Sequence, residues 1–447
     1  MPLAGFPIDK RSALLLDKEN MTKYSISPMS SLYELYLRHP RISTDSRRIE
    51  PDSVFFALRG ASFDGNRFAA DALEKGAAYA VVDDPSLPNT RPDKADRLIV
   101  VDDALQTLQA LAREHRRELG LPILTITGSN GKTTTKELVS RVLAEKYEVY
   151  ATRGNLNNHI GVPLTLLAMT RDVEFGIVEM GASACGEIAL LCSIAEPNYG
   201  IVTNIGRAHL EGFGGPEGVR RGKGELYDWL ARTGGRVFVP ANDPVLMSMA
   251  AERETLAAEC YPTTLADGVE HHLEGDYNRF NVAAAVAVGH YFGVDDERIR
   301  YAVGSYRPDN HRSQKIRTGQ NTLILDCYNA NPSSMQASLV NFRQEPLESC
   351  TRKILILGDM LELGDWSDAE HRHIISLAAE IPDARILLVG PHFAKAYRSL
   401  ESRPADTTLY PSQEALAAEL RKHPVSQALI LVKGSHSIGL ERLADLL

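Results

Sequence analysis

The chain has 447 residues, and at about 150 residues per domain this length predicts about three domains. Apolar residues make up 44% and charged residues 24%, which are ordinary globular values and exclude disordered, fibrous and collagen-like proteins. Since 49 Lys and Arg stand against 58 Asp and Glu, the net charge of −9 leaves no overall basic field for nucleic acid, and an anionic ligand must be bound by a few local groups.

The first elements along the chain predict a small α/β domain over residues 1–106. Its start, residues 1–20, contains an apolar run of only four residues between charges, so we expect a disordered segment rather than a signal peptide. Strand-like runs follow at 53–58 and 78–82, with a helix-like stretch at 68–75 between them.

The second block predicts a parallel sheet in a domain over residues 107–306. A charged helical segment at 105–118 leads to a buried strand at 123–127, a Gly-rich turn and an amphipathic helix at 133–146. Further strands are expected at 175–179, 199–204 and 235–240. Because strands alternate with helices, we expect helices on both faces of the sheet.

The third block, residues 307–447, repeats this alternation. Strands are expected at 322–326, 353–358, 385–390 and 428–433, with helical stretches between them. The pattern predicts a second doubly wound, Rossmann-like α/β unit.

The sequence lacks two signals that bear on the cellular compartment, a membrane-spanning segment and paired cysteines. No run approaches the about 18 to 20 apolar residues that span a bilayer. Five cysteines without a CxxC pair predict reduced thiols. We therefore expect a cytoplasmic protein without a membrane span and without a nucleic-acid partner.

The strongest local signal is the string TGSNGKTTT, residues 127–135, between the buried strand and the helix. Gly128 and Gly131 allow a tight turn whose N–H groups point at phosphate oxygens, and the helix N-terminus adds its positive end. Lys132 supplies a point charge for the phosphates and Thr133 an oxygen for Mg²⁺. A strict GxxxxGKS/T loop would need glycine where the chain has Ile126, so the string is a shorter variant of the phosphate loop.

Glu179 and His209 each follow a predicted strand of the second block. At the carboxyl ends of neighbouring parallel strands, both side chains could hold a metal beside the phosphate loop. Taken alone, a glutamate there is usually solvated and a single histidine is usually a surface or capping residue. Lys223, in the string RGKGELY, has by itself only the features of a solvated helix lysine.

Taken together, these strings resemble the central ATPase domain of the Mur ligases, the ATP-dependent amide-forming ligases of peptidoglycan precursor synthesis. TGSNGKTTT, EMG, NIGRAHLEGFGG and RGKGELY occur in the order and at the spacing of that family. STDSR, VFFALRG and DGN resemble its UDP-binding N-terminal domain, and DCYNANPSSM and LGDMLELG its C-terminal domain. About 400 of the 447 residues are covered.

The resemblance implies roles for individual residues. Catalysis is expected from Lys132, Glu179, His209 and Lys223, the last of them carbamylated, and two Mg²⁺ ions on Thr133, Glu179 and His209. ATP is expected to contact Gly128, Ser129, Asn130, Gly131, Lys132, Thr133, Thr134, Asn278, Arg312 and Asp326. Substrate binding is expected from Asp45, Ser46 and Arg47 for the uridine diphosphate and from Asn155, Asn157, Asn158, Tyr328, Asn329 and Asn331 near the acceptor.

Two strings, TRGNLNNHIGVPL and DCYNANPSSM, resemble the MurF branch of the family. This branch implies a ligase, expected to be a monomer, that joins D-Ala-D-Ala to UDP-MurNAc-tripeptide through an acyl phosphate. Closure of the third domain over the second would exclude water and bring Arg312 and Asp326 to the nucleotide. Without ligands we expect those two residues to lie far from Lys132.

Three alternatives fit the sequence less well than this interpretation. Another amide ligase of the Mur or folylpolyglutamate type would have a different acceptor, but Asn329 and Asn331 fit neither the D-Y-A-H-T-P nor the D-G-A-H-N-P string of those relatives. A GTP-dependent switch would carry an N-K-x-D string, and the nearest match, Asn242-Asp243-Pro244, lacks the lysine. A dinucleotide-binding third domain would need G-x-G-x-x-G after its first strand, where the chain has Tyr328-Asn329-Ala330-Asn331.

Overall fold

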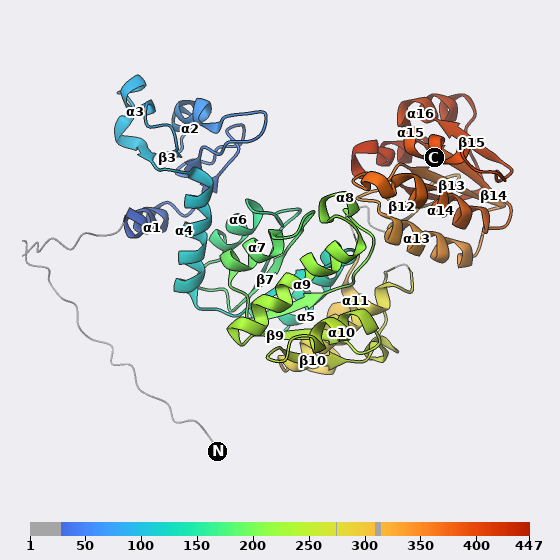
Figure 1. Cartoon of the computed structure of the whole chain (residues 1–447), viewed down its shortest axis with the longest axis horizontal. Coiled ribbons are helices and arrows are strands. Elements are labelled where there is room, and N and C mark those ends of the chain that lie inside the picture. Colours follow the sequence, from blue (N-terminus) through green and yellow to red (C-terminus); the bar gives the residue numbers. More distant parts are fainter. Residues whose placement is uncertain (1–27, 274, 309–313) are drawn as a thin grey trace, which may run out of the picture.

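The computed structural model describes residues 28–273, 275–308 and 314–447, which form three α/β units in chain order (Figure 1). The expected disordered segment, residues 1–20, lies outside the described residues. The first unit has one parallel sheet of order β1-β2-β3-β4. Its strands are β1 (Ile42–Ser43), β2 (Val54–Phe56), β3 (Tyr79–Val82) and β4 (Leu98–Val100), and its helices are α1 (Pro28–Arg38), α2 (Ala69–Glu74) and α3 (Leu87–Thr90).

The second unit is a parallel six-stranded sheet of order β10-β9-β8-β5-β7-β6. Its strands are β5 (Ile123–Thr127), β6 (Val149–Ala151), β7 (Phe175–Glu179), β8 (Tyr199–Val202), β9 (Arg236–Pro240) and β10 (Ala257–Tyr261). Its helices are α4 (Ala104–Leu119), α5 (Lys132–Ala144), α6 (Gly161–Leu167), α7 (Glu187–Ala195), α8 (Leu210–Phe213), α9 (Pro216–Thr233), α10 (Pro244–Ala251), α11 (Asn278–Tyr291) and α12 (Asp296–Ser305).

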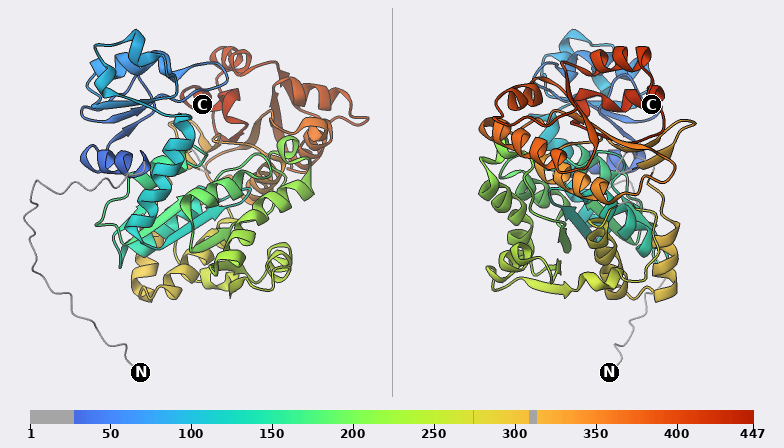
Figure 2. Two further views of the ribbon diagram at one scale, coloured as in Figure 1. Left: turned by 60° about the vertical axis from the view of Figure 1, so that its left-hand side comes forward. Right: turned by 90° about the vertical axis from the view of Figure 1, so that its right-hand side faces the viewer.

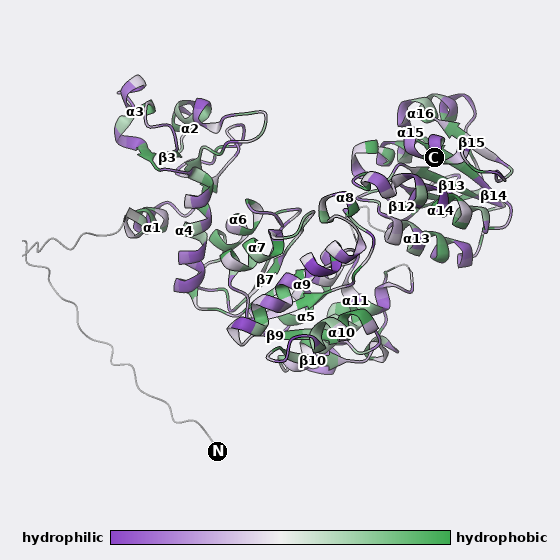
Figure 3. Cartoon of the chain, viewed as in Figure 1, coloured by the Kyte–Doolittle hydropathy of each residue, from purple (hydrophilic) through white to green (hydrophobic). Residues whose placement is uncertain are grey.

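Alternate residues of the central strands pack into separate cores, because successive side chains of a strand point to opposite faces. Val237 and Val239 of β9 join the core beneath α4, α7 and α9, whereas Phe238 joins the core beneath α5, α11 and α12. The prediction of a parallel sheet covered by helices on both faces is therefore confirmed. The hydropathy colouring shows the same division, with hydrophobic strands inside and hydrophilic outer faces on α4 and α9 (Figure 3).

The third unit has sheet order β11-β12-β16-β13-β14-β15, parallel except for its first pair. The predicted doubly wound unit is confirmed, and the antiparallel edge strand β11 was not predicted. Its strands are β11 (Gln314–Arg317), β12 (Thr322–Asp326), β13 (Arg352–Gly358), β14 (Ala384–Val389), β15 (Thr407–Tyr410) and β16 (Ala428–Lys433). Its helices are α13 (Pro332–Gln344), α14 (Ser367–Ala379), α15 (Pro391–Arg398) and α16 (Gln413–Lys422).

Helix α4 joins the first two units. It packs against β2 on one side and against α6 and α7 on the other, and one apolar core runs from Phe56 and Val81 through Leu108 and Leu111 to Ile123. The boundary expected between residues 106 and 107 therefore falls inside a single helix. Figure 2 shows the chain coloured as in Figure 1 from two further sides.

The second and third units meet at the short helix α8. Leu210 and Phe213 of α8 share an apolar core with Met360 and Leu363 of the third unit. The third unit therefore packs against the central one at α8. The expectation that Arg312 and Asp326 lie far from Lys132 stays a prediction, because Arg312 lies outside the described residues. None of the helices formed by the described residues is both long and apolar enough to cross a membrane.

Candidate functional site

A cleft of about 890 Å³ opens between the carboxyl ends of the central strands and those of the third sheet. On the central side it is lined by the loop after β5, by Glu179 at the end of β7 and by the segment after β8. On the other side it is lined by Asp326 at the end of β12 and by Lys433 at the end of β16. In parallel α/β sheets this edge is the usual place for a ligand.

The conformation of the loop after β5 depends on two glycines, at positions that have no room for a side chain. Gly128 has a φ of 138°, and a Cβ there would lie 2.0 Å from Oγ1 of Thr203. Gly131 has a φ of 79°, and its Cβ would lie 2.6 Å from Oδ1 of Asn281. The two residues therefore supply a backbone conformation that other residues rarely adopt, together with a close approach to neighbouring segments.

Neighbouring side chains hold this loop in place. The N–H of Asn130 donates to Oδ1 of Asn204 (3.1 Å), and Oγ1 of Thr203 donates to the carbonyl of Asn130 (2.6 Å). The N–H of Gly206 donates to Oγ of Ser129 (2.9 Å). The loop is thus held by hydrogen bonds against the segment that follows β8.

Lys132 begins α5 and lies at the positive end of that helix. Its Nζ donates to the carbonyls of Gly128 (2.8 Å) and Ser129 (3.1 Å), so the ammonium is folded back over the loop. Thr133 is buried, and Thr133 and Thr134 line the cleft. A loop of this geometry, with a lysine at a helix N-terminus, is a binding site for phosphate groups.

Glu179 presents a buried carboxylate to the cleft. Its Oε1 accepts a hydrogen bond from Nδ2 of Asn157 (2.9 Å), and its Oε2 is buried with no hydrogen-bond partner among the described residues. A buried oxygen without a donor is costly unless a cation completes it. Oxygen donors from Glu179 and Thr133 in one cleft are the ligand type that Mg²⁺ prefers, so the residues present fit that ion.

His209 follows β8 in a left-handed conformation, with a φ of 53°. Its ring pairs through Nδ1 with the carboxylate of Glu362 from the third unit, and both residues line the cleft. His209 is thus brought to the cleft that also contains Glu179, as expected, but it is engaged by a residue that the sequence did not single out. Within the part of the chain that the structure describes, no group of three or more His, Cys, Asp or Glu side chains gathers as a metal cluster.

Lys223 lies on α9 and is only 1% exposed. Its Nζ donates to the carbonyl of Ala182 (3.2 Å), which lines the cleft, and lies 5.2 Å from the centre of the Phe213 ring. Burial, and after it the charge of Lys132, lowers the pKa of Lys223 to about 7. A buried lysine of this kind carries a large fraction of neutral amine near neutral pH, which the sequence alone did not indicate.

The wall formed by the third unit is organised by a buried ion pair. Nζ of Lys433 donates to Oδ2 of Asp326 (2.5 Å) and to the carbonyl of Asn329 (3.3 Å). Asn331 caps α13 by accepting from the N–H of Ser334 (2.9 Å), while its Nδ2 donates across the cleft to Oδ1 of Asn130 in the phosphate loop (2.8 Å). Lys433 was not singled out from the sequence, because its partners are more than 100 residues away.

The remaining residues expected at the acceptor are placed differently from one another. Asn158 lines the cleft, but its Oδ1 caps the start of α6 by accepting from the N–H of Gly161 (2.9 Å). Tyr328 lines the cleft and stacks on His436, with ring centres 6.2 Å apart. Asn155 is exposed and is not among the residues that line the cleft.

Asn278, the residue expected at the adenine, begins α11 and lines the cleft. Its Oδ1 accepts from Nδ2 of Asn281 (2.8 Å), and Oδ1 of Asn281 accepts from Oγ1 of Thr135 on α5 (3.0 Å). This chain of hydrogen bonds connects Asn278 to the helix that follows the phosphate loop. Arg312, the other expected nucleotide contact, lies outside the described residues.

The residues expected to bind uridine diphosphate are on the first unit and do not line the cleft. Asp45 and Arg47 form an exposed ion pair (2.8 Å), and the guanidinium holds the pKa of the Asp45 carboxyl well below its usual range. Ser46 is engaged through its carbonyl, which accepts from Nζ of Lys75 (2.8 Å).

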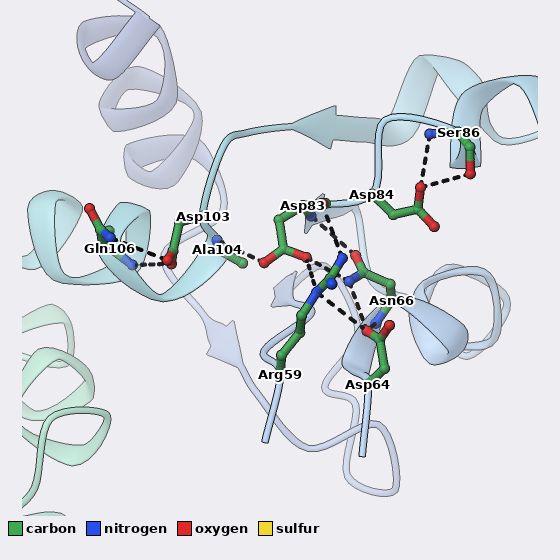
Figure 4. Close-up of polar contacts among 9 residues, drawn as sticks. All are labelled: Arg59, Asp64, Asn66, Asp83, Asp84, Ser86, Asp103, Ala104 and Gln106. Atoms are coloured by element: carbon green, nitrogen blue, oxygen red, sulfur yellow. Dashed lines mark hydrogen bonds and ion pairs between the residues drawn. The ribbon is translucent and has the colours of Figure 1, made fainter. Parts of the chain in front are cut away.

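A polar network in the first unit connects two of the strings from the sequence (Figure 4). Asp83 accepts from Arg59 (2.8 Å) and from Nδ2 of Asn66 (2.6 Å), and its second oxygen accepts from the N–H of Ala104 at the start of α4 (3.4 Å). Arg59 belongs to VFFALRG and Asn66 to DGN, so both strings stabilise the join between the first unit and α4.

Comparisons with known proteins agree with this geometry. Family models match the Mur ligase middle domain at residues 126–264, the Mur ligase glutamate ligase domain at 311–436 and the Mur ligase family catalytic domain at 40–116. The UDP-N-acetylmuramoyl-tripeptide–D-alanyl-D-alanine ligase of Bacillus subtilis (strain 168) is 34% identical over 90% of this chain and 92% of its own. The enzyme of that name from Escherichia coli (strain K12) is 30% identical over 90% and 92%.

Two solved structures are also similar. MurF from Acinetobacter baumannii has a TM-score of 0.80 at 30% identity and covers 91% of this chain and 93% of its own. MurF ligase from Thermotoga maritima in complex with ADP has a TM-score of 0.77 at 25% identity and covers 92% and 97%. With a phosphate loop, a buried carboxylate and a third unit that meets them across one cleft, the chain belongs to the Mur ligase family.

Proposed function

We propose that this chain is an ATP-dependent ligase that joins D-Ala-D-Ala to UDP-MurNAc-tripeptide and produces UDP-MurNAc-pentapeptide, ADP and phosphate. One observation carries the proposal: the phosphate loop and the Asn329–Asn331 turn of the third unit line the same cleft and touch through Asn130 and Asn331 (2.8 Å). A phosphoryl donor and an acceptor amine held in one cleft can react as neighbours rather than by diffusion.

The reaction then has two steps. The terminal carboxylate of the tripeptide attacks the γ-phosphorus of ATP, the bond to the β–γ bridging oxygen breaks, and an acyl phosphate and ADP result. The amine of D-Ala-D-Ala attacks the acyl carbon, and the tetrahedral intermediate expels phosphate to leave the amide. Lys132 and the N–H groups of the loop hold the phosphates, while closure of the third unit keeps water from the acyl phosphate.

Thr133, Glu179 and His209 are the residues that would hold Mg²⁺ in this site. When bound, the ions neutralise the phosphate charge that increases during transfer. Oε2 of Glu179, which accepts no hydrogen bond from the described residues, supports this proposal, and Asn157 orients the same carboxylate through its other oxygen.

Lys223 is proposed to be carbamylated. A neutral amine adds to CO₂ to give a carbamate anion and a proton, and burial of Lys223 provides the neutral amine near pH 7. The modification would turn a buried cation into an anion.

Because ATP and nucleotide-linked precursors occur in the cytoplasm, we place the reaction there, and we propose that the chain acts as a monomer.

The acceptor is tested by ADP release with UDP-MurNAc-tripeptide and a panel of amines. D-Ala-D-Ala should drive release, while D-Ala, D-Glu, L-Lys and meso-diaminopimelate should not. A site that hydrogen-bonds a second residue leaves amides unpaired, at about 1 to 3 kcal/mol each, when that residue is missing. Release that is equally fast with a single amino acid would refute the proposed acceptor while leaving the ligase chemistry intact.

A further inference from the structure

Helix α5 carries a second lysine one turn beyond Lys132, and the mechanism above does not use it. Lys136 is 1% exposed. Its Nζ donates to the carbonyl of Thr152 (2.5 Å), lies 2.9 Å from Oε1 of Glu137, and lies 4.0 Å from the unpartnered Oε2 of Glu179. A lysine is almost never buried to this extent without a specific partner.

The two carboxylates near this ammonium are in different surroundings. Glu137 is 39% exposed, so solvent screens its attraction to Lys136. Glu179 is only 2% exposed, so its charge interacts through a medium of lower effective dielectric constant. Although Glu137 is closer, Glu179 is the partner whose attraction to Lys136 is less screened by solvent.

Lys136 is also connected to the segment that orients Glu179. Thr152, whose carbonyl accepts from Lys136, also accepts through Oγ1 from the N–H of Glu179 (3.0 Å). The same segment continues to Asn157, whose amide donates to Oε1 of Glu179 (2.9 Å) and whose carbonyl accepts from the N–H of Gly181 (2.8 Å). The Lys136 ammonium therefore holds Thr152, the first residue of this segment, in place. It also lies near the carboxylate of Glu179, which Asn157 at the other end of the segment orients.

We propose that Lys136 is a positioning residue: it is the built-in counter-cation of Glu179 and aligns the 152–157 segment with β7. At 4.0 Å it compensates the charge of the buried carboxylate without a hydrogen bond to Oε2, which is buried and has no hydrogen-bond partner among the described residues. The consequence for ligation rests on the proposed function, because the 152–157 segment borders the expected acceptor site.

The charge relation is tested by a double-mutant cycle on the full chain in EDTA, so that no metal takes part. Lys136→Met should lower the unfolding temperature by about 5 °C or more, because it leaves a buried carboxylate without its counter-charge. In the Glu179→Gln background the same substitution should cost at most half as much, because the charge to be compensated is gone. In the matched Glu137→Gln background it should cost as much as in the wild type.

Equal costs in the wild-type and Glu179→Gln backgrounds would overturn the proposal, because a lysine that only holds the Thr152 carbonyl predicts exactly additive effects. A cost that falls only in the Glu137→Gln background would overturn it as well. If Lys136→Met alone does not fold, the double variant decides: recovery of folded protein supports the proposal, and failure of both variants refutes it.

Positioning is tested by separating acceptor use from nucleotide binding. Lys136→Met should raise the KM for D-Ala-D-Ala about tenfold, while the Kd of ADP measured calorimetrically in EDTA should change by less than about twofold. A KM that stays at the wild-type value, or a Kd that rises together with KM, would refute the positioning role. If the wild-type chain does not use D-Ala-D-Ala, the proposed function fails, and the thermal cycle still decides the relation between Lys136 and Glu179.

Discussion

Replacing Lys223 by methionine should make the protein more stable and inactive at the same time. Burial lowers the pKa of this lysine from 10.5 to about 7, which corresponds to about 5 kcal/mol of unfavourable free energy for the charged form in the folded state. Below pH 7 the lysine is protonated in the folded and the unfolded chain, so the whole cost is present. Between pH 7 and 10.5 only the unfolded chain retains the proton, so stability rises with pH.

Methionine has no such dependence, so the gain from Lys223→Met should be largest at pH 6 and should shrink by about 3 kcal/mol at pH 9.5. The assay is thermal unfolding of both proteins in EDTA and bicarbonate-free buffer at these two pH values, since other groups cancel in the difference. For a domain of this size the difference in Tm should fall by about 6 °C or more between pH 6 and pH 9.5. A gain that is constant, or that grows with pH, would refute the burial of a charged amine as the cause.

Two further predictions concern the cleft. Lys132→Ala should lower ATP-dependent ADP release by about 10²-fold or more while circular dichroism shows an unchanged fold, because a preorganised charge at the phosphates is lost; near-normal turnover would remove the phosphate-loop assignment. Glu370→Gln should weaken the contact of the third unit with the central one, because the almost buried Glu370 pairs with Arg207 across that interface. Solution scattering should then show a larger radius of gyration than for the wild type, and an unchanged value would contradict this role of the ion pair.

A structural feature could be predicted from the sequence alone where all of its residues lie in one short segment. The phosphate loop is such a case, because β5, the two glycines and the start of α5 are contiguous. The strands Ile123–Thr127 and Phe175–Glu179 were predicted at their exact bounds, since buried parallel strands are continuous apolar runs. The strands β1 and β6, of two and three residues, are too short to show a period and were missed.

Residues whose roles depend on distant segments could not be predicted in this way. Lys136 and Lys433 look in the sequence like ordinary charged residues of a helix and a strand end, and only the folded chain shows that each is buried beside a carboxylate. Glu362 lies 153 residues from His209, so their pairing depends on how the third unit meets the second. Asn158 was expected to bind substrate, but its Oδ1 accepts a hydrogen bond from the start of helix α6, a role that the sequence did not indicate.

Helix α8 belongs to the second unit in sequence but packs into the apolar core of the third unit. This packing limits how the chain can be divided into fragments. Leu210, Phe213 and Val219 complete the apolar core that Met335, Leu355 and other residues of the third unit form. A recombinant fragment that starts near residue 307 would therefore leave this core uncovered and expose a sticky apolar surface. A synthetic peptide that spans residues 205–220 should bind such a fragment and restore its solubility. The peptide and the fragment would then together form the apolar core that the intact chain forms by itself.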